Sequence, residues 1–391
     1  MPKLPRDLWI IFISLLFFSS GLGLYSVIMP AHIRDLGASS LELGLLGSLA
    51  MAVNTLVALP GGMWADRFER KKLMIISWAM CIPVPLIFAL AGHWVWLIPG
   101  FVLFNLSMFS NAAMQSYIAA KCTPENRSST FTLVHTAFPL GMVIAPTMGG
   151  FLAEEWGIRA VFWVSLVCYT ISTLVLTQLS PSHPAGPRTK MAVVLDPRSY
   201  PRPFWKLVLI FSLVWFIISI PMSFNTPFLQ DVARFDLLTI GFLGSMAAIG
   251  GATLTPFIGR VADSRGTWRI LALCLFVLAL TFVVQLYTSV VSVLVVAFFV
   301  RGGTNVVMSL MTALITGAAD PKSMGMSFAL YNMMGGFAAT LSPYVAGYLY
   351  AHHPAYPFVA TIILAISLGL YFFGKAQTPR ENDCAAGEKY A

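Results

Sequence analysis

Residues 62–72 read Gly62-Met-Trp-Ala-Asp66-Arg67-Phe-Glu69-Arg70-Lys71-Lys72, a short charged stretch between two long apolar runs. A related stretch begins 197 positions later (259 − 62) and reads Gly259-Arg-Val-Ala-Asp263-Ser-Arg265-Gly-Thr-Trp-Arg269. In each copy an Asp closes one apolar run and cations follow it. Charged side chains are expensive in hydrocarbon, so such stretches mark places where the chain leaves an apolar layer. The sequence therefore contains two matching turns, one in each half.

The same offset of 197 pairs many other residues of the two halves. The pairs include Pro30 with Pro227, Gly44 with Gly241, Gly47 with Gly244, Ser48 with Ser245, Pro124 with Pro321, Pro146 with Pro343 and Gly150 with Gly347. Pro and Gly that recur at one offset over so long a stretch indicate an internal duplication. Two copies with an even number of membrane spans share one orientation and leave a seam between them at the centre of the bilayer.

The amino-acid composition indicates that this chain lies in a lipid bilayer. Of its 391 residues, 58% are hydrophobic and 10% charged, whereas soluble domains are about 25% charged. The apolar runs are long enough to cross about 30 Å of hydrocarbon. The expected fold class is an all-α integral membrane protein, with twelve transmembrane helices as two parallel six-helix repeats. The expected spans are 8–32, 41–64, 72–91, 94–119, 129–153, 159–179, 205–230, 237–261, 268–288, 289–315, 323–350 and 353–374.

A linker and the basic residues give the domain organisation and the orientation. Residues 180–204 are rich in Pro, Arg and Lys, which is typical of a linker, and they divide the chain into halves 1–179 and 205–391. All but four of the 24 Lys and Arg residues fall on the side of the N-terminus; the exceptions are Arg34, Arg159, Arg234 and Arg301. This bias predicts that both termini and the linker are cytoplasmic, in a plasma membrane of the bacterial inner-membrane type.

The charged stretch at 62–72 resembles the loop signature of the major facilitator superfamily, Gly-x-x-x-Asp-Arg-x-Gly-Arg-Lys-Lys, with Glu69 in place of the second Gly. The resemblance implies a transporter that works by alternating access. It also implies a gating set of Gly62, Asp66, Arg67, Arg70, Lys71, Gly259, Asp263 and Arg265. An Asp beside several cations can form a charge-assisted network that braces one conformation. The alternative is that the cations only fix the orientation of the spans in the membrane.

The fifth span carries a second signature. Gly141-x-x-x-Ala145-Pro146-x-x-Gly149-Gly150 resembles the antiporter motif of drug-exporting members of that superfamily, with Ala145 standing where one of its glycines belongs. Pro146 predicts a kinked helix, and the small residues permit close helix approach. Pro343 predicts a similar kink in the second half. The predicted kink residues are Gly141, Pro146, Gly150 and Pro343. Since Gly and Pro are frequent in transmembrane helices, the motif favours export without establishing it.

Polar and aromatic residues recur on the helices that line the cavity in the superfamily. The expected substrate-binding residues are Arg301, Asn305, Asn111, Gln115, Tyr25, Trp215 and Asn332. Aromatic, amide and hydroxyl groups suit an amphiphilic organic molecule. The alternative is that these side chains only hold neighbouring helices together. All sixteen acidic residues map to loops or span ends, so His135 is the candidate for proton coupling, against the alternative of a structural histidine.

We therefore expect an exporter of a small amphiphilic molecule that works as a monomer in the lipid bilayer, with protons as a candidate coupling ion. The alternatives are an uptake carrier that binds a small organic anion through Arg301, and a membrane sensor that borrows the fold. Most cations sit in the short loops between apolar runs rather than on a binding face or an arm, so no nucleic-acid partner is expected. Five cysteines without metal-ligand spacing give no metal site. No cofactor and no enzymatic reaction are expected, because no paired embedded carboxylates or Gly-x-Ser-x-Gly element occurs.

Overall fold

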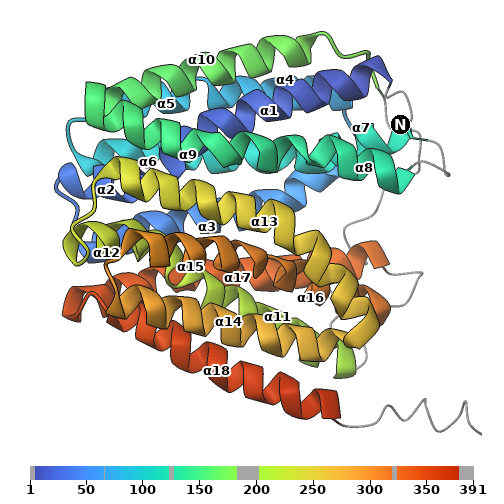
Figure 1. Ribbon diagram of the computed structural model, residues 1–391. Coiled ribbons are helices and arrows are strands. Elements are labelled where there is room, and N and C mark those ends of the chain that lie inside the picture. Colours follow the sequence, from blue (N-terminus) through green and yellow to red (C-terminus); the bar gives the residue numbers. More distant parts are fainter. Residues whose placement is uncertain (1–4, 66, 123–126, 183–201, 319–323, 378–391) are drawn as a thin grey trace, which may run out of the picture.

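The computed structural model describes residues 5–65, 67–122, 127–182, 202–318 and 324–377, and this part of the chain is helical throughout, without strands. The helices run nearly lengthwise in one bundle (Figure 1). We call the end where α3 meets α4 and α13 meets α14 the motif end, because residues 62–72 and 259–269 lie there. The other end, where α2 and α12 lie side by side (Figure 1), is the opposite end.

Each half contributes six spans, several of them built from two helices. The first half contains α1 (Arg6–Ser26), α2 (Met29–Asp35), α3 (Ser40–Ala65), α4 (Arg70–Cys81), α5 (Pro83–Leu90), α6 (Ile98–Ser107), α7 (Asn111–Ala120), α8 (Arg127–His135), α9 (Ala137–Trp156) and α10 (Ile158–Thr177). The second contains α11 (Arg202–Ser219), α12 (Asn225–Asp231), α13 (Leu237–Arg265), α14 (Thr267–Tyr287), α15 (Val291–Gly303), α16 (Val306–Ala318), α17 (Met324–His352) and α18 (Tyr356–Gln377).

Eleven of these segments are long and apolar enough to cross a membrane. The twelfth is α17, a helix of 29 residues that packs along α3 and α11. The twelve-span prediction is confirmed, including the tight connection between α14, which ends at Tyr287, and α15, which begins at Val291. Several boundaries differ by a few residues: α11 begins at Arg202, three residues before the predicted start of that span, and α13 ends at Arg265, four residues after the predicted end. The interior of the predicted linker, residues 183–201, lies outside the described residues.

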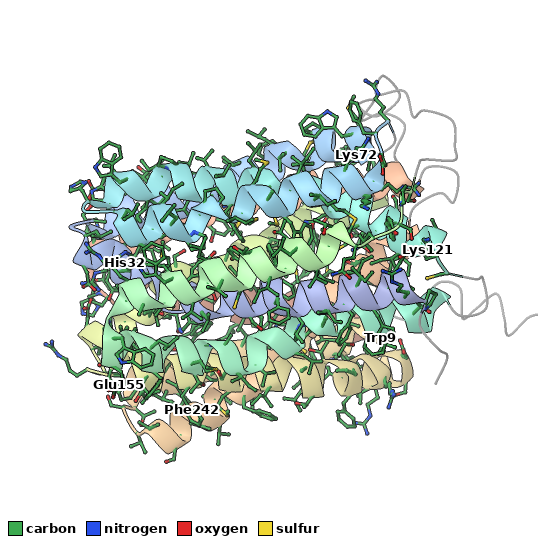
Figure 2. The ribbon with its side chains drawn as sticks, turned by 90° about the horizontal axis from the view of Figure 1, so that it is seen from above. Trp9, His32, Lys72, Lys121, Glu155 and Phe242 are labelled. Atoms are coloured by element: carbon green, nitrogen blue, oxygen red, sulfur yellow. The ribbon has the colours of Figure 1, made fainter. Side chains whose placement is uncertain are left out.

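Side chains on the outer surface fit a hydrocarbon environment. Leu56, Leu209 and Phe257 are each more than 60% exposed, which would be costly in water. Figure 2 shows Lys72 and Lys121 at the motif end, Glu155 at the opposite end, and Phe242 on the outer side between them. Charge at both ends and apolar residues between them are what a membrane span requires.

The helix breaks follow the internal repeat. The first span is interrupted after Ser26 and the seventh after Ser219. The fourth span is interrupted between Ser107 and Asn111, and the tenth between Gly303 and Val306. With the offset of 197, each pair of breaks falls within a few residues of the same place. The duplication therefore preserved backbone irregularities as well as residue types.

The halves meet along two helix pairs, α3 with α17 and α9 with α13. A side chain at Gly44 would collide with the Pro343 carbonyl oxygen, and one at Gly241 with the Pro146 carbonyl oxygen. These contacts are related by the offset of 197 (44 to 241, 146 to 343), so they are the same contact made twice. Glycine here allows two backbones to approach more closely than any other residue permits.

Hydrogen bonds next to the two prolines repeat the same symmetry. Pro146 lies inside α9 and Pro343 inside α17, and a proline ring displaces the carbonyl four residues earlier. The following N–H donates instead to a serine of the other half: Thr147 N–H to Ser245 Oγ (3.2 Å) and Tyr344 N–H to Ser48 Oγ (3.1 Å). The predicted kink prolines thus tie the two halves together.

Candidate functional site: a cavity between two ends

A cavity of about 380 Å³ opens in the first half. Its lining combines aromatic and apolar residues with amides, hydroxyls and an imidazole. The lining residues are Leu15, Phe18, Ser77, Trp78, Ser107, Met108, Asn111, Met114, Gln115, His135 and Phe138. They come from α1, α4, α6, α7, α8 and α9 and from the short 3₁₀ turn at 108–110, so the break in the fourth span forms part of the wall.

The polar part of this cavity is concentrated at three predicted residues. His135 Nε2 lies 3.2 Å from Gln115 Oε1, within hydrogen-bond distance. Asn111 opens α7 and is exposed, with its amide 4.0 Å from the Met108 sulfur. Because an imidazole N–H bonded to an amide oxygen leaves the other ring nitrogen free, His135 can offer a proton donor or acceptor to a molecule in the cavity.

Behind the lining lies a network of buried hydroxyl groups. Trp78 Nε1 donates to Ser172 Oγ (2.9 Å), and Ser172 also bonds Ser14 (2.9 Å). Ser77 Oγ donates to the Ser107 carbonyl (2.6 Å). These bonds fix the rotamers of two lining side chains, Ser77 and Trp78, from behind, which makes this wall rigid.

Other predicted substrate residues lie outside this cavity. Tyr25 is 4% exposed and its hydroxyl bonds the Tyr169 hydroxyl (2.9 Å), so it belongs to the interior of the first half in this conformation. Trp215 is partly buried and packs edge-on against Phe211. Asn305 and Asn332 are exposed on the second half. The structure thus brings together the first-half candidates except Tyr25, and none of the second-half candidates lines this cavity.

Arg301 lies near the end of α15 and is partly exposed. Its Nη1 donates to Gln285 Oε1 (2.8 Å) and to Asn225 Oδ1 (3.4 Å), while Gln285 Nε2 donates to the same Asn225 oxygen (2.9 Å). The guanidinium carbon stands 3.7 Å from the Phe298 ring centroid and 5.0 Å from that of Phe282. These partners are amides and ring faces, without a carboxylate among the described contacts.

At the opposite end the halves are joined by an ion pair. Arg34 Nη1 lies 2.7 Å from Asp231 Oδ2, and the Tyr350 hydroxyl donates to the same oxygen (2.8 Å). Arg34 and Asp231 are themselves separated by 197 positions. They are therefore equivalent residues of the two copies, and a direct contact between them lies close to the axis that relates the halves. Glu154 of α9 adds a second bridge by accepting the Leu237 N–H at the start of α13 (2.7 Å).

At the motif end, the predicted gating residues that the structure describes form no ion pairs with one another. Asp66 lies outside the described residues. Arg70 donates its N–H to the Ser182 carbonyl (2.9 Å), which holds the start of the linker against α4. Arg67, Asp263 and Arg265 are exposed and Lys71 is partly exposed, and none of them forms an ion pair with another described residue. A side chain at Gly62 or Gly259 would meet open space.

Sequence reasoning missed several residues of these sites. Ser77 and Trp78 were overlooked because the third span was not assigned to the cavity. Asn225 and Gln285 were overlooked as partners of Arg301, although amides in apolar spans 7 and 9 were a visible signal. The pair of Arg34 and Asp231 could have been found from its spacing, which equals the repeat offset.

A twelve-span bundle made of two like halves, with a mainly apolar cavity inside the first half, is the architecture of a membrane carrier. The family model described as Major Facilitator Superfamily matches residues 11–291 and 240–389. The chain belongs to the major facilitator superfamily, a family of membrane transporters.

Curated relatives cover nearly the whole chain. It is 27% identical over 403 residues to "Multidrug resistance protein 2" of Bacillus subtilis (strain 168), covering 97% of this chain and 98% of that protein. It is 27% identical over 367 residues to "Multi-drug resistance efflux pump PmrA homolog" of Lactococcus lactis, covering 88% and 89%. Both relatives are aligned over most of their length.

Solved structures confirm the fold. The nucleoside transporter NupG superposes with a TM-score of 0.80 at 11% identity, covering 96% of this chain and 100% of that one. A bacterial homologue of the human lysosomal transporter Spinster, in an inward-facing and occupied conformation, superposes with a TM-score of 0.76 at 18% identity over 95% and 96%. At these identities the likeness concerns the architecture.

Proposed function

We propose that this protein exports small amphiphilic organic molecules from the cytoplasm by alternating access. The main support for this proposal is the cavity. Its aromatic and Met side chains can bury the apolar part of a substrate, while Gln115, His135 and Asn111 offer hydrogen bonds. The efflux proteins among the relatives, matched over most of their length, support export as the direction. The antiporter-like motif around Pro146 supports it as well.

The orientation follows from charge. The motif end and the linker carry most of the basic residues, so the motif end faces the cytoplasm, both termini are inside, and the halves are 1–179 and 205–391. The opposite end, closed by the Gly–Pro contacts and the ion pair of Arg34 and Asp231, then faces outward. The conformation described here would be inward-facing. Opening outward would require the motif end to close, which is the proposed role of Asp66 with Arg67, Arg70 and Lys71, and of Asp263 with Arg265.

Proton coupling is proposed at His135, which meets Gln115 in the cavity wall. A proton bound there while the substrate is absent would be exchanged for substrate, since both compete for the same polar groups.

Everted membrane vesicles test the function. Vesicles that contain the protein should accumulate fluorescent amphiphilic compounds when energised, and vesicles from cells without the gene should not. Failure to transport any compound of a broad panel, by folded protein in sealed vesicles, would contradict the exporter proposal.

A further inference from the structure

The polar cluster around Arg301 is not required by the fold. With the repeat offset of 197, Arg301, Gln285 and Asn225 correspond to Phe104, Phe88 and Ile28 of the first half. Phe88 is 1% exposed and Ile28 is fully buried, so the first half fills the same place with apolar side chains. Replacing a buried charged network by well-packed apolar residues is commonly neutral or stabilising. The second half therefore keeps its cation for a reason other than packing.

The contacts of the guanidinium leave one edge available. Both of its hydrogen bonds use Nη1. Nε and Nη2 have no acceptor among the described residues, and neither belongs to the polar atoms that are sealed from solvent without a partner. Arg301 donates to Gln285 and to Asn225, and Gln285 also donates to Asn225. Together these bonds hold the guanidinium in one orientation. An arginine edge with two free N–H groups matches a carboxylate, sulfonate or phosphate, which it binds with two parallel hydrogen bonds.

A charge in this position needs a counterion. A guanidinium within the membrane is stabilised by water, carbonyl groups or an anion. No carboxylate of the described residues pairs with Arg301, and in the sequence all sixteen acids fall in loops or at the ends of spans. The two phenyl rings that flank the guanidinium reduce its hydration on those sides. An anion that reaches the free edge would therefore gain more than it would at the protein surface.

The repeat also relates Arg301 to the cavity. Its counterpart Phe104 stacks on Phe18, a lining residue, with ring centroids 6.3 Å apart. Thr304 corresponds to the lining residue Ser107, and Thr304 Oγ donates to the Arg301 carbonyl (2.6 Å). Arg301 is thus within one helical turn of the second-half counterpart of the cavity wall.

We propose that Arg301, positioned by Gln285 and Asn225, is an anion subsite of the carrier, and that its preferred substrates are amphiphilic organic anions. The acid group of the substrate binds the free edge of Arg301 with two parallel hydrogen bonds. This inference rests on the proposed export function and adds the substrate class. It differs from uptake of an organic anion in the direction of transport.

A matched compound series in energised everted vesicles tests it. Three compounds share one aromatic body and carry a carboxylate, a primary amide or an amine. Wild type is expected to transport the carboxylate at least tenfold faster than the amide at equal concentration. Arg301→Met should reduce that preference at least tenfold while amide transport changes less than twofold. Gln285→Met should raise the KM for the carboxylate, since the guanidinium loses its orientation, and Arg159→Gln, which removes an exposed cation, should leave the preference unchanged.

Arg301→Lys tests whether the positive charge is sufficient or the forked shape of the guanidinium is needed. It also replaces Arg301→Met in the assay if Arg301→Met does not fold. It should retain the charge but lose most of the carboxylate preference, because an ammonium cannot form the forked pair. Repeating the assay with chloride replaced by gluconate distinguishes a substrate subsite from a site for a small inorganic anion: a preference that follows chloride overturns the proposal. Equal transport of the three compounds by wild type, or an unchanged preference in both arginine variants, also overturns it while leaving the export function intact. Export lost for all compounds in wild type would instead contradict the function itself.

Discussion

At the scale of single residues, the ion pair of Arg34 and Asp231 has a modest strength that can be estimated. Both side chains are about one-third exposed (31% and 33%), and exposed ion pairs contribute about 0–1 kcal/mol. A two-state equilibrium shifts by about fivefold for 1 kcal/mol. The pair can therefore tune the closure of the opposite end but cannot account for all of it.

We expect Arg34→Asp to populate the outward-open state severalfold more than wild type, because two carboxylates would then face each other near the axis. Asp231→Arg in the same chain should restore the wild-type distribution, since the pair is merely exchanged between equivalent positions. Distances between spin labels at the opposite end measure the distribution. A double variant that behaves like the sum of its single variants would show that the two side chains do not interact.

His135 gives a second prediction at this scale. His135→Gln keeps a hydrogen-bonding group beside Gln115 but cannot bind a proton at neutral pH. Energised uptake into everted vesicles should fall at least tenfold, while substrate binding measured by thermal stabilisation stays within about threefold of wild type. Leu140→Ala, which changes an exposed side chain of α9 outside the cavity lining, is the control and should retain coupling. Wild-type energised uptake by His135→Gln would assign coupling to another group.

At the scale of helices, the close crossings dominate closure of the opposite end. Gly44 and Gly241 each face a proline carbonyl of the other half at a distance that no side chain tolerates. Gly44→Val should prevent α3 from approaching α17, so the inward-facing state becomes rare and transport falls at least tenfold. Gly374→Ala, which adds a methyl group to α18 where there is open space, is the control. Labelling of cysteines at the opposite end should rise in Gly44→Val, and unchanged labelling would contradict this account.

Helices were also the level that sequence reasoning predicted best. Hydrocarbon thickness fixes the length of each span, so the twelve segments could be placed within a few residues, and the repeat offset paired Pro146 and Pro343, which both lie inside helices. Contacts between helices could not be predicted in this way. Tyr25 and Trp78 show why: which face of a helix meets the cavity depends on its rotation in the bundle, and one span's apolar pattern does not determine that rotation.

At the scale of the whole molecule, the two halves differ in their interiors more than in the contacts they make with each other. Their Gly–Pro contacts at the opposite end remain symmetric, whereas the first half lines a cavity of about 380 Å³ and the second carries the cluster of Arg301, Gln285 and Asn225. Symmetric contacts suit a rocking motion between equivalent halves. On the proposals above, the asymmetric interior supplies an apolar cavity in one half and an anion subsite in the other.

The orientation of the whole molecule gives the last prediction. With the motif end in the cytoplasm, Glu155→Cys should react with a membrane-impermeant thiol reagent in intact cells, and Lys72→Cys should react only after the membrane is opened. Both side chains are exposed and lie at the two ends of the bundle in Figure 2, so access to the reagent decides the result. The native cysteines are replaced beforehand; Cys81 and Cys274 are buried, so Ser or Ala should be tested at each. Labelling of Lys72→Cys in intact cells, with Glu155→Cys protected, would invert the topology. The closed end would then face the cytoplasm, and the conformation described here would be outward-facing.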